Sequence, residues 1–345
     1  MKTLFDKTDM NGLKLKNRLI RSATGENLAT EGGNIPQDLY DTYIKLAQGG
    51  IGTIIFGFTS VAPVDHFKTG LMRLHDNSLI PEYHKLVEEV HTYDCVAIPQ
   101  LALGVYMKAN TSGQYAEVRP DDMTKEDIKD VVEKFVSAAV RAKKAGFDGV
   151  QLHGAHGFLL SSFISPLHNH RNDEYGGSTK GRVKIILDII QGIRDETGTI
   201  HLSIKINNCD YIHGGLMPEE SLIICQMLEE AGMNSIEVSG NSPCVSGIVP
   251  KRNEGYFAPF AVSLQSSVKI PVILTGGHRS LEHMNKLLNE NGINYFSLSR
   301  PLIKEPDLPN RWKNGDVRPS TCISCNNCFQ NYGHKCIFNK TEVVK

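Results

Sequence analysis

A strand–helix junction that occurs twice limits the fold of this chain more than any other feature of its sequence. The segment AGFDGVQLHG (145–154) has a near twin in AGMNSIEVSG (231–240), and each follows an amphipathic stretch, residues 127–144 and 219–230. In both copies a glycine ends the helix and a short apolar strand follows. A chain built from such units is predicted to alternate helices with parallel strands.

Eight strands of this kind are predicted over about 300 residues. They cover residues 19–23, 52–58, 96–102, 149–153, 201–207, 235–240, 271–276 and 294–299. Eight right-handed strand–helix units match a closed barrel better than an open doubly wound sheet, and no G-x-G-x-x-G follows the first strand. The predicted fold is therefore α/β, a (β/α)₈ TIM barrel over residues 1–310. A short cysteine-rich C-terminal extension, residues 311–345, is expected to pack on it.

Charge and hydropathy exclude several classes of partner. The chain has 37 Lys and Arg against 38 Asp and Glu, which argues against a nucleic-acid surface. No apolar run reaches the length of about 18 residues that a membrane span needs, and the first residues lack the apolar centre of a signal peptide. A cytoplasmic location without a membrane partner is expected.

The barrel prediction brings polar residues at the ends of distant strands to one mouth, where barrel active sites lie. The segments LTGGHRS (274–280) and SLSRP (297–301) end the last two strands. Backbone N–H groups at Gly276 and Gly277 with the guanidinium of Arg300 would form a phosphate cradle. The alternative is two ordinary strand–helix turns.

Two further polar side chains end predicted strands at this mouth. Gln100 offers a donor and an acceptor suited to a flat heteroaromatic ring. Lys205 lies between Ile204 and Ile206, so its side chain points away from theirs. Inside a barrel it needs an anionic or electron-rich partner; otherwise it is an outward-facing lysine whose stem covers apolar surface.

His153 and His156 follow the fourth predicted strand, three residues apart. As metal ligands they lack a third histidine or carboxylate at a familiar zinc spacing. Either one could be a structural histidine. The interpretation that we favour is a pair of donors that bind a carbonyl or anionic oxygen and so polarise an electron-poor double bond.

The segment GVQLHGAHGFLLSSFISPLHNHRNDEYGGS (149–178) resembles the old yellow enzyme family, FMN-dependent ene-reductases built on (β/α)₈ barrels. Further matches are LKNRLIRSAT, PQL, IKIN, LTGG and SRPLIKEP, which extend the resemblance through about residue 310. It implies a noncovalent FMN, reduced by NADH or NADPH, and hydride transfer to an activated alkene. The implied partner is a small unsaturated molecule, and a homo-oligomer is expected by analogy alone.

The resemblance also implies roles for residues at the mouth. It implies that eight of them bind FMN, which are Ala23, Thr24, Gln100, Lys205, Gly276, Gly277, Ser299 and Arg300. The family counterparts of His153 and His156 hydrogen-bond the substrate oxygen. The counterpart of Lys205 stabilises the reduced, anionic flavin ring.

Two positions depart from the family pattern. The aromatic residue after the second histidine is usually a tyrosine that resembles the proton donor, whereas this chain has Phe158, which has no proton to give. Either Tyr106, Tyr256, a histidine or water then supplies the proton, or the reaction needs no such acid. Leu103 stands where many relatives have histidine. Both changes favour a bulky or apolar substrate.

Four cysteines, Cys322, Cys325, Cys328 and Cys336, are packed into fifteen residues. In a cytosolic protein this indicates a metal more than disulfides, either one Zn²⁺ or an iron–sulfur cluster, and four reduced buried cysteines are the other alternative. CISCNNC resembles the C-x-x-C-N-x-C of larger family members, trimethylamine dehydrogenase and 2,4-dienoyl-CoA reductase, in which cysteines hold a [4Fe–4S] cluster. A chain without their additional domains would need a protein electron donor, such as ferredoxin or an electron-transferring flavoprotein.

Three functions are therefore expected, in descending order. The first is FMN-dependent reduction of an activated C=C bond. The second is oxidative amine dehydrogenation or demethylation, suggested by the cysteine segment and the missing tyrosine. The third is a flavin electron carrier or redox sensor without a small-molecule substrate.

Overall fold

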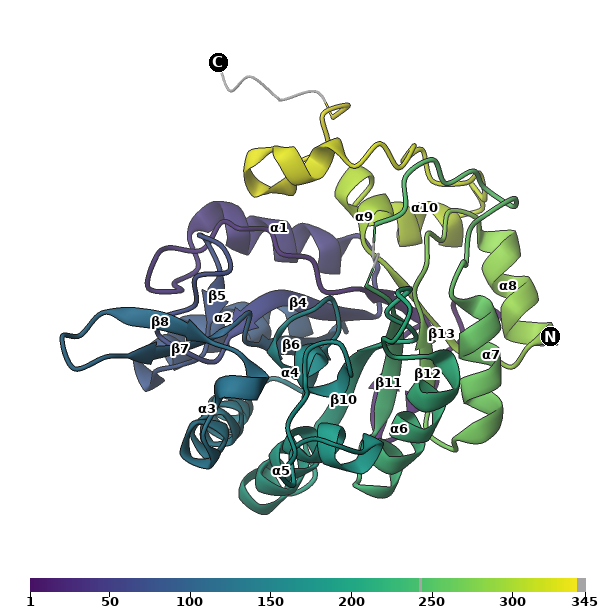
Figure 1. Ribbon diagram of the computed structural model, residues 1–345. Helices are drawn as coiled ribbons and strands as arrows, with labels where there is room; N and C mark the ends of the chain where they lie inside the picture. Colours follow the sequence, from purple (N-terminus) through teal and green to yellow (C-terminus); the bar gives the residue numbers. More distant parts are fainter. Residues whose placement is uncertain (242–243, 340–345) are drawn as a thin grey trace.

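The computed structural model describes residues 1–241 and 244–339, and its centre is a closed barrel of parallel strands (Figure 1). The barrel strands are β3 (Leu19–Arg21), β4 (Thr53–Ser60), β6 (Val96–Ala102), β9 (Gly149–Gly154), β10 (His201–Asn207), β11 (Ser235–Ser239), β12 (Val272–Leu274) and β13 (Tyr295–Leu298). The last strand, β13, pairs with β3, which also pairs with β4, so the sheet closes. The predicted (β/α)₈ barrel is confirmed, with all eight strands near their expected positions.

Helices surround the barrel and cover its outer face (Figure 1). They are α1 (Gln37–Gln48), α2 (Ile80–His91), α3 (Lys125–Lys144), α4 (Leu159–Ile164), α5 (Thr179–Thr197), α6 (Pro218–Glu230), α7 (Ala258–Ser267), α8 (Leu281–Glu290), α9 (Arg300–Lys304) and α10 (Leu308–Lys313). The two helices expected from amphipathic spacing are α3 and α6. Within the described residues, no helix is both long and apolar enough to cross a membrane.

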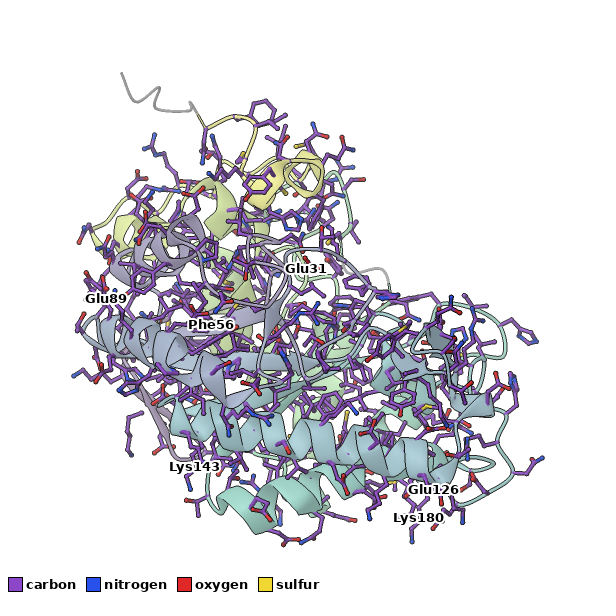
Figure 2. All side chains as sticks on the ribbon, turned by 90° about the vertical axis from the view of Figure 1, so that its left-hand side faces the viewer. Glu31, Phe56, Glu89, Glu126, Lys143 and Lys180 are labelled. Carbon is purple, nitrogen blue, oxygen red and sulfur yellow. The ribbon has the colours of Figure 1, made fainter. Side chains whose placement is uncertain are left out.

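The core lies between the barrel and its helices. Phe56 of β4 is fully buried there and packs its ring 4.2 Å from that of Tyr43 on α1. Figure 2 shows Phe56 inside the molecule, whereas Glu126 and Lys143, at the two ends of α3, lie at its edge. The apolar stripe of α3 faces inward and its charged residues face solvent, as the sequence pattern predicts.

A hairpin of β1 (Thr8–Met10) and β2 (Leu13–Leu15) closes the end of the barrel where the strands begin. Met10 and Leu15 form a cluster with residues inside the barrel, which are Ile20, Ile55, Val96, Ile98, Ile273 and Tyr295. A second hairpin, β7 (Tyr106–Ala109) with β8 (Tyr115–Val118), projects from the side of the barrel (Figure 1). Neither hairpin was predicted. The short strand β5 (Met72–Arg73) extends the sheet beside β4.

A buried ion pair fixes the loop that follows β3. The guanidinium of Arg21 lies 2.9 Å from the carboxylate of Glu26, and the two side chains are only 3% and 4% exposed. Tyr43 donates a hydrogen bond of 3.1 Å to the other oxygen of Glu26. The loop passes so close to β4 that a Cβ on Gly57 would lie 1.9 Å from the carbonyl oxygen of Thr24. Thr24 is thereby held at the barrel mouth.

The segment after α10 crosses the rim of the mouth (Figure 1). Arg279 donates a hydrogen bond to the carbonyl of Cys322 at 3.0 Å and another to the hydroxyl of Ser324 at 2.5 Å. Arg300 donates to the side chain of Asn326 at 2.5 Å. These contacts attach the cysteine segment to the ends of β12 and β13. The division into domains at residue 310 stays a prediction.

Replacing Glu26 with Gln should lower the free energy of unfolding by about 3 to 5 kcal/mol, because the charge of Arg21 would stay buried without its partner. Urea unfolding followed by circular dichroism measures this. Lys14→Met is the control, since Lys14 pairs with Asp9 on an exposed surface and should matter little. A Glu26→Gln loss no larger than the control's would contradict the assigned role.

Candidate active site

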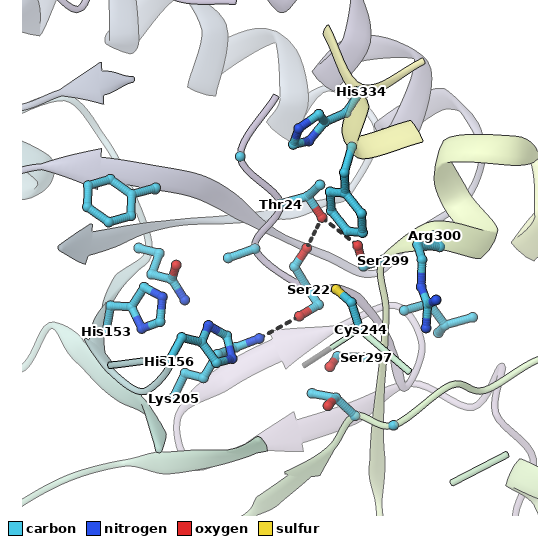
Figure 3. Close-up of a pocket in the computed structure, with 18 of the residues that line it drawn as sticks. Ser22, Thr24, His153, His156, Lys205, Cys244, Ser297, Ser299, Arg300 and His334 are labelled. Atoms are coloured by element: carbon cyan, nitrogen blue, oxygen red, sulfur yellow. Dashed lines mark hydrogen bonds between the residues drawn. The ribbon is translucent and has the colours of Figure 1, made fainter. Parts of the chain in front are cut away.

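The strand ends of the barrel surround a cavity of about 290 Å³ (Figure 3). All ten residues predicted for the cofactor and substrate line this one cavity, which are Ala23, Thr24, Gln100, His153, His156, Lys205, Gly276, Gly277, Ser299 and Arg300. They come from six different strand ends, so only the closed barrel brings them together. Their individual roles stay predictions.

A buried carboxylate that the sequence analysis missed organises the floor of this cavity. Glu237 of β11 is fully buried, and the Nζ atom of Lys205 lies 3.1 Å from its Oε1 atom. Ser22 and Ser297 donate hydrogen bonds of 2.8 and 2.6 Å to the same oxygen. Lys205 also donates to the hydroxyl of Ser22 at 2.7 Å. The buried lysine thus has the anionic partner that its position requires.

The same carboxylate orients Gln100. The side-chain amide of Gln151 donates to Oε2 of Glu237 at 2.9 Å, and Gln100 donates to the carbonyl oxygen of Gln151 at 2.8 Å. Lys205 and Glu237 are direct partners in the β10–β11 register. A polar residue flanked by Ile236 and Val238 in an interior strand was the signal that could have identified Glu237.

Glycines shape the opposite end of the cavity. Gly276 and Gly277 have φ angles of 121° and 78°, which side-chain-bearing residues rarely adopt. A Cβ on Gly276 would lie 3.1 Å from the backbone nitrogens of Tyr256 and Phe257. Beside them, Thr24 and Ser299 share a hydrogen bond of 2.8 Å between their hydroxyls. This end of the cavity therefore exposes backbone and hydroxyl groups.

The described lining is strongly cationic. Lys68, Lys205, Arg279 and Arg300 all line the cavity, and no aspartate or glutamate does among the residues that the structure describes. Glu237 lies behind the lining and pairs with Lys205. The cavity is therefore suited to a ligand with more than one negative group.

The two histidines form one wall of the cavity. The rings of His153 and His156 are 4.9 Å apart at nearly right angles. The Nδ1 atom of His153 accepts a 3.4 Å hydrogen bond from the amide of Ala155, which leaves Nε2 to carry the proton. His156 has a left-handed φ of 66°, and its Nε2 atom hydrogen-bonds the hydroxyl of Ser239 at 2.8 Å. Both rings are held by the protein before any ligand binds.

Burial keeps both histidines neutral. Burial, with the positive charge of Lys205, lowers the pKa of His156 to about 3. Burial lowers the pKa of His153 well below its ordinary value, and His156 and Lys205 lower it further. Each ring therefore acts as a neutral hydrogen-bonding group near neutral pH.

Phe158 belongs to an aromatic cluster beside the histidines. Its ring lies 4.5 Å from that of Phe67, 5.2 Å from that of Phe58 and 4.8 Å from that of His153. Phe58, Phe67 and Phe158 all line the cavity. This apolar wall is consistent with the expected preference for an apolar substrate.

Two expectations that followed from the positions where this chain departs from the family pattern are wrong. Tyr106 does not line the cavity, because its hydroxyl donates 2.9 Å to Asp130 on α3, and so it is not a candidate acid. Leu103 packs in the hydrophobic core instead of the cavity, so it does not make the site less polar. Tyr256 does line the cavity, and burial raises its pKa.

The four clustered cysteines line a second, smaller cavity next to the first. Cys322, Cys325, Cys328 and Cys336 share this cavity with Arg300, which also lines the main one. Among the described residues, no three His, Cys, Asp or Glu side chains are placed to hold a metal ion. The segment reaches the main cavity as well, through residues that the sequence analysis missed, Phe329 and His334.

Fold and site together define a (β/α)₈-barrel protein whose mouth is suited to an anionic, ring-bearing cofactor. The chain belongs to the NADH:flavin oxidoreductase / NADH oxidase family, whose model matches residues 3–318. It is 32% identical to the NADH oxidase of Thermoanaerobacter brockii over 97% of this chain and 56% of that protein. The predicted family resemblance is thereby confirmed. The chain spans about half the length of the first curated relatives that it matches.

Two solved structures share the fold. A 2-naphthoyl-CoA reductase complexed with 2-naphthoyl-CoA superposes with a TM-score of 0.87 at 22% identity, covering 98% of this chain and 57% of that one. Histamine dehydrogenase from Rhizobium sp. 4-9 superposes with a TM-score of 0.84 at 23% identity, covering 96% of this chain and 50% of that one. Identities this low support the architecture alone.

The residues of the cavity fit FMN, the family's cofactor. The glycine pair excludes side chains and leaves room for a phosphate beside Arg300 and Ser299. At the other end, Lys205 and Gln100 present donors that the network of Glu237 holds in place.

Gly276→Ala should weaken FMN binding about tenfold, because an alanine there is strained and displaces the backbone of residues 256 and 257. Flavin fluorescence titration of the apoprotein measures the Kd. Gly292→Ala is the matched control, since Gly292 also has a positive φ but its Cβ would meet nothing within 4 Å. Equal FMN affinity in the two variants would contradict the cradle.

Proposed function

We propose that this protein is an FMN-dependent oxidoreductase that reduces an activated C=C bond, with electrons from NADH, NADPH or a protein donor. The observation that carries the proposal is the shared cavity, in which His153 and His156 stand opposite the predicted phosphate cradle and beside Lys205. Bound FMN would supply the hydride. The protein residues bind, orient and polarise the alkene.

The histidine pair would hold the oxygen of a carbonyl, carboxylate or nitro group conjugated to the alkene. The Nε2–H of His153 is a donor, because its Nδ1 atom accepts from Ala155. Hydrogen bonds to this oxygen withdraw electron density from the β-carbon and stabilise the negative charge that develops on the oxygen. Because both rings are neutral and fixed, they need little reorganisation during the reaction.

Protonation of the α-carbon needs another group, since Phe158 carries no acidic proton. Tyr256 lines the cavity and is a phenol, but its ring lies against Gly277 at the end opposite the histidines, so water is the proton source that we assign, with Tyr256 as the alternative. The aromatic cluster beside the histidines would hold an apolar part of the substrate and exclude water around it.

His156→Ala should lower kcat/KM for alkene reduction about 100-fold, because it removes one polarising group. Reoxidation of photoreduced flavin by a panel of enones and enoates measures the alkene step without NAD(P)H. His168→Ala, an exposed histidine in the loop after α4, is the matched control. The proposal fails if no alkene reoxidises the flavin in the unaltered protein, or if both variants behave alike.

Amine oxidation is the second candidate. Phe58, Phe67 and Phe158 would suit a methylated ammonium group by cation–π contact. The cationic lining counts against it, because the described residues provide no carboxylate to neutralise an ammonium ion. Bleaching of the oxidised flavin by methylated amines would favour this function over alkene reduction.

We also propose that the clustered cysteines hold an iron–sulfur cluster. What supports the proposal is that all four line one small cavity and that CISCNNC resembles the cluster-binding segment of larger family members. Thiolates are the ligands of such clusters, and Zn²⁺ is the alternative. Arg300 lines both this cavity and the main one, so a cluster here would lie next to the FMN site.

Cys328→Ser should remove iron and acid-labile sulfide from anaerobically purified protein and leave the flavin bound. Metal analysis and the visible spectrum measure both. Cys225→Ser is the control, because Cys225 is buried in α6, far along the chain from the cluster. Stoichiometric zinc without sulfide, or no metal in the unaltered protein, would contradict the cluster.

A further inference from the structure

One cation of the main cavity has no assignment in the proposed function. Arg300 and Arg279 belong to the cradle end, and Lys205 is paired with Glu237. Lys68 lies on the segment between β4 and β5, next to Phe67 of the aromatic cluster. Within the described residues, no carboxylate forms an ion pair with Lys68. It therefore places an uncompensated positive charge beside the apolar wall where the alkene would bind.

His334 brings a second unmatched group to the same rim. It is only 6% exposed, lines the cavity, and stands on the far side of Thr24 from Lys205 in Figure 3. Its Nε2 atom lies 3.0 Å from the side-chain nitrogen of Asn27. An amide nitrogen only donates, so Nε2 accepts and the hydrogen of the ring is on Nδ1.

The Nδ1 atom of His334 is buried and has no hydrogen-bond partner in the part of the chain that the structure describes. A buried donor without an acceptor costs free energy, and native proteins rarely retain one without a reason. An acceptor atom of a bound ligand would satisfy it. The ammonium group of Lys68 and the Nδ1–H group of His334 are thus two donors at one rim, and neither has an acceptor among the described residues.

A groove leads outward from this rim. Asn27 and Lys68 line both the main cavity and a neighbouring groove of about 890 Å³. The side chains of Tyr115, on the β7–β8 hairpin, and Tyr332, on the cysteine segment, also line this groove. A ligand that reacts at the histidines therefore has space to extend past Lys68 toward solvent.

The acidic residues of this groove do not neutralise Lys68. Asp65 is buried, and its two oxygens accept hydrogen bonds from the backbone amides of Phe67 and Gly104 at 3.1 Å each. Glu31 also lines the groove but is exposed, and it does not line the main cavity. The positive potential at the inner end of the groove therefore stays available to a ligand.

We propose that Lys68 and the Nδ1–H group of His334 form an anion subsite, and that the substrate is an activated alkene joined to a carboxylate or phosphate group. This inference rests on the proposed function. It assigns the apolar wall to the reacting part of the substrate and the rim to its anionic group. The cysteine segment then contributes directly to substrate selection through His334.

The test uses three matched enones on the holoenzyme. They are 4-phenyl-3-buten-2-one with a para-carboxylate, the methyl ester of that acid, and the para-phosphonate analogue. Flavin is photoreduced, so no NAD(P)H is present, and single-turnover reoxidation gives the rate for each compound. Spectral titration of the oxidised flavin gives each Kd independently of turnover.

We expect the acid or the phosphonate to be preferred over the ester about tenfold, chiefly through binding, and the preference to shrink as salt rises. Lys68→Met and His334→Phe should each bring the acid-to-ester ratio close to one, and Lys68→Arg should preserve it. Lys144→Met, at the exposed end of α3, is the charge-matched control. A larger effect with the phosphonate than with the acid would identify phosphate as the recognised group.

Three outcomes would overturn the subsite. Equal Kd values for acid, phosphonate and ester in the unaltered protein would rule out the anion subsite and leave the proposed alkene reduction unaffected. Loss of the preference in Lys144→Met as well would mean that overall charge, not this rim, is responsible. An effect of Lys68→Met confined to flavin reduction by NADH or NADPH would assign Lys68 to the dinucleotide. If no enone reoxidises the flavin, the proposed function fails, and the titrations still decide the subsite.

Discussion

The carboxylate of Glu237 is the interaction on which the site depends. It is fully buried and joins Lys205, Gln151, Ser22 and Ser297, which come from four other strand ends. A buried charge is tolerated only when its hydrogen bonds are complete. Moving any partner away would leave the carboxylate with an unpaired oxygen, and this free-energy cost holds each partner in place. The barrel supplies the geometry, and this network fixes the polar groups within it.

The barrel could be predicted because its strands carry apolar residues at strand spacing and end at glycines and polar turns. The two hairpins lacked this signal. Strands β1 and β2 have three residues each, and β8 is largely exposed, so neither shows an apolar pattern that a sequence could reveal. The first hairpin is positioned by Met10 and Leu15, which pack against residues inside the barrel, and such a tertiary contact has no local sequence signal.

For the site, residues at strand ends were predictable and their partners were not. Once eight parallel strands were expected, Gln100 and Lys205 had to meet at one mouth. The spacing of Glu237 between two apolar residues indicates an inward side chain, but its pairing with Lys205 depends on the strand register, which the sequence does not show. Lys68 and His334 were missed because they lie on a loop and on the C-terminal segment, and only tertiary packing brings them to the rim. The direction of Tyr106 was likewise set by carboxylates on α3.

The hairpin at the other end of the barrel has a consequence for kinetics. Met10 and Leu15 fill the space among the strand beginnings, so reactants reach the interior from the mouth. If the proposed function holds, a reductant and an alkene would have to enter through this same mouth in turn, and the first product would leave before the second reactant enters. A ping-pong order of events would then follow from apolar packing on the side of the barrel where no chemistry occurs.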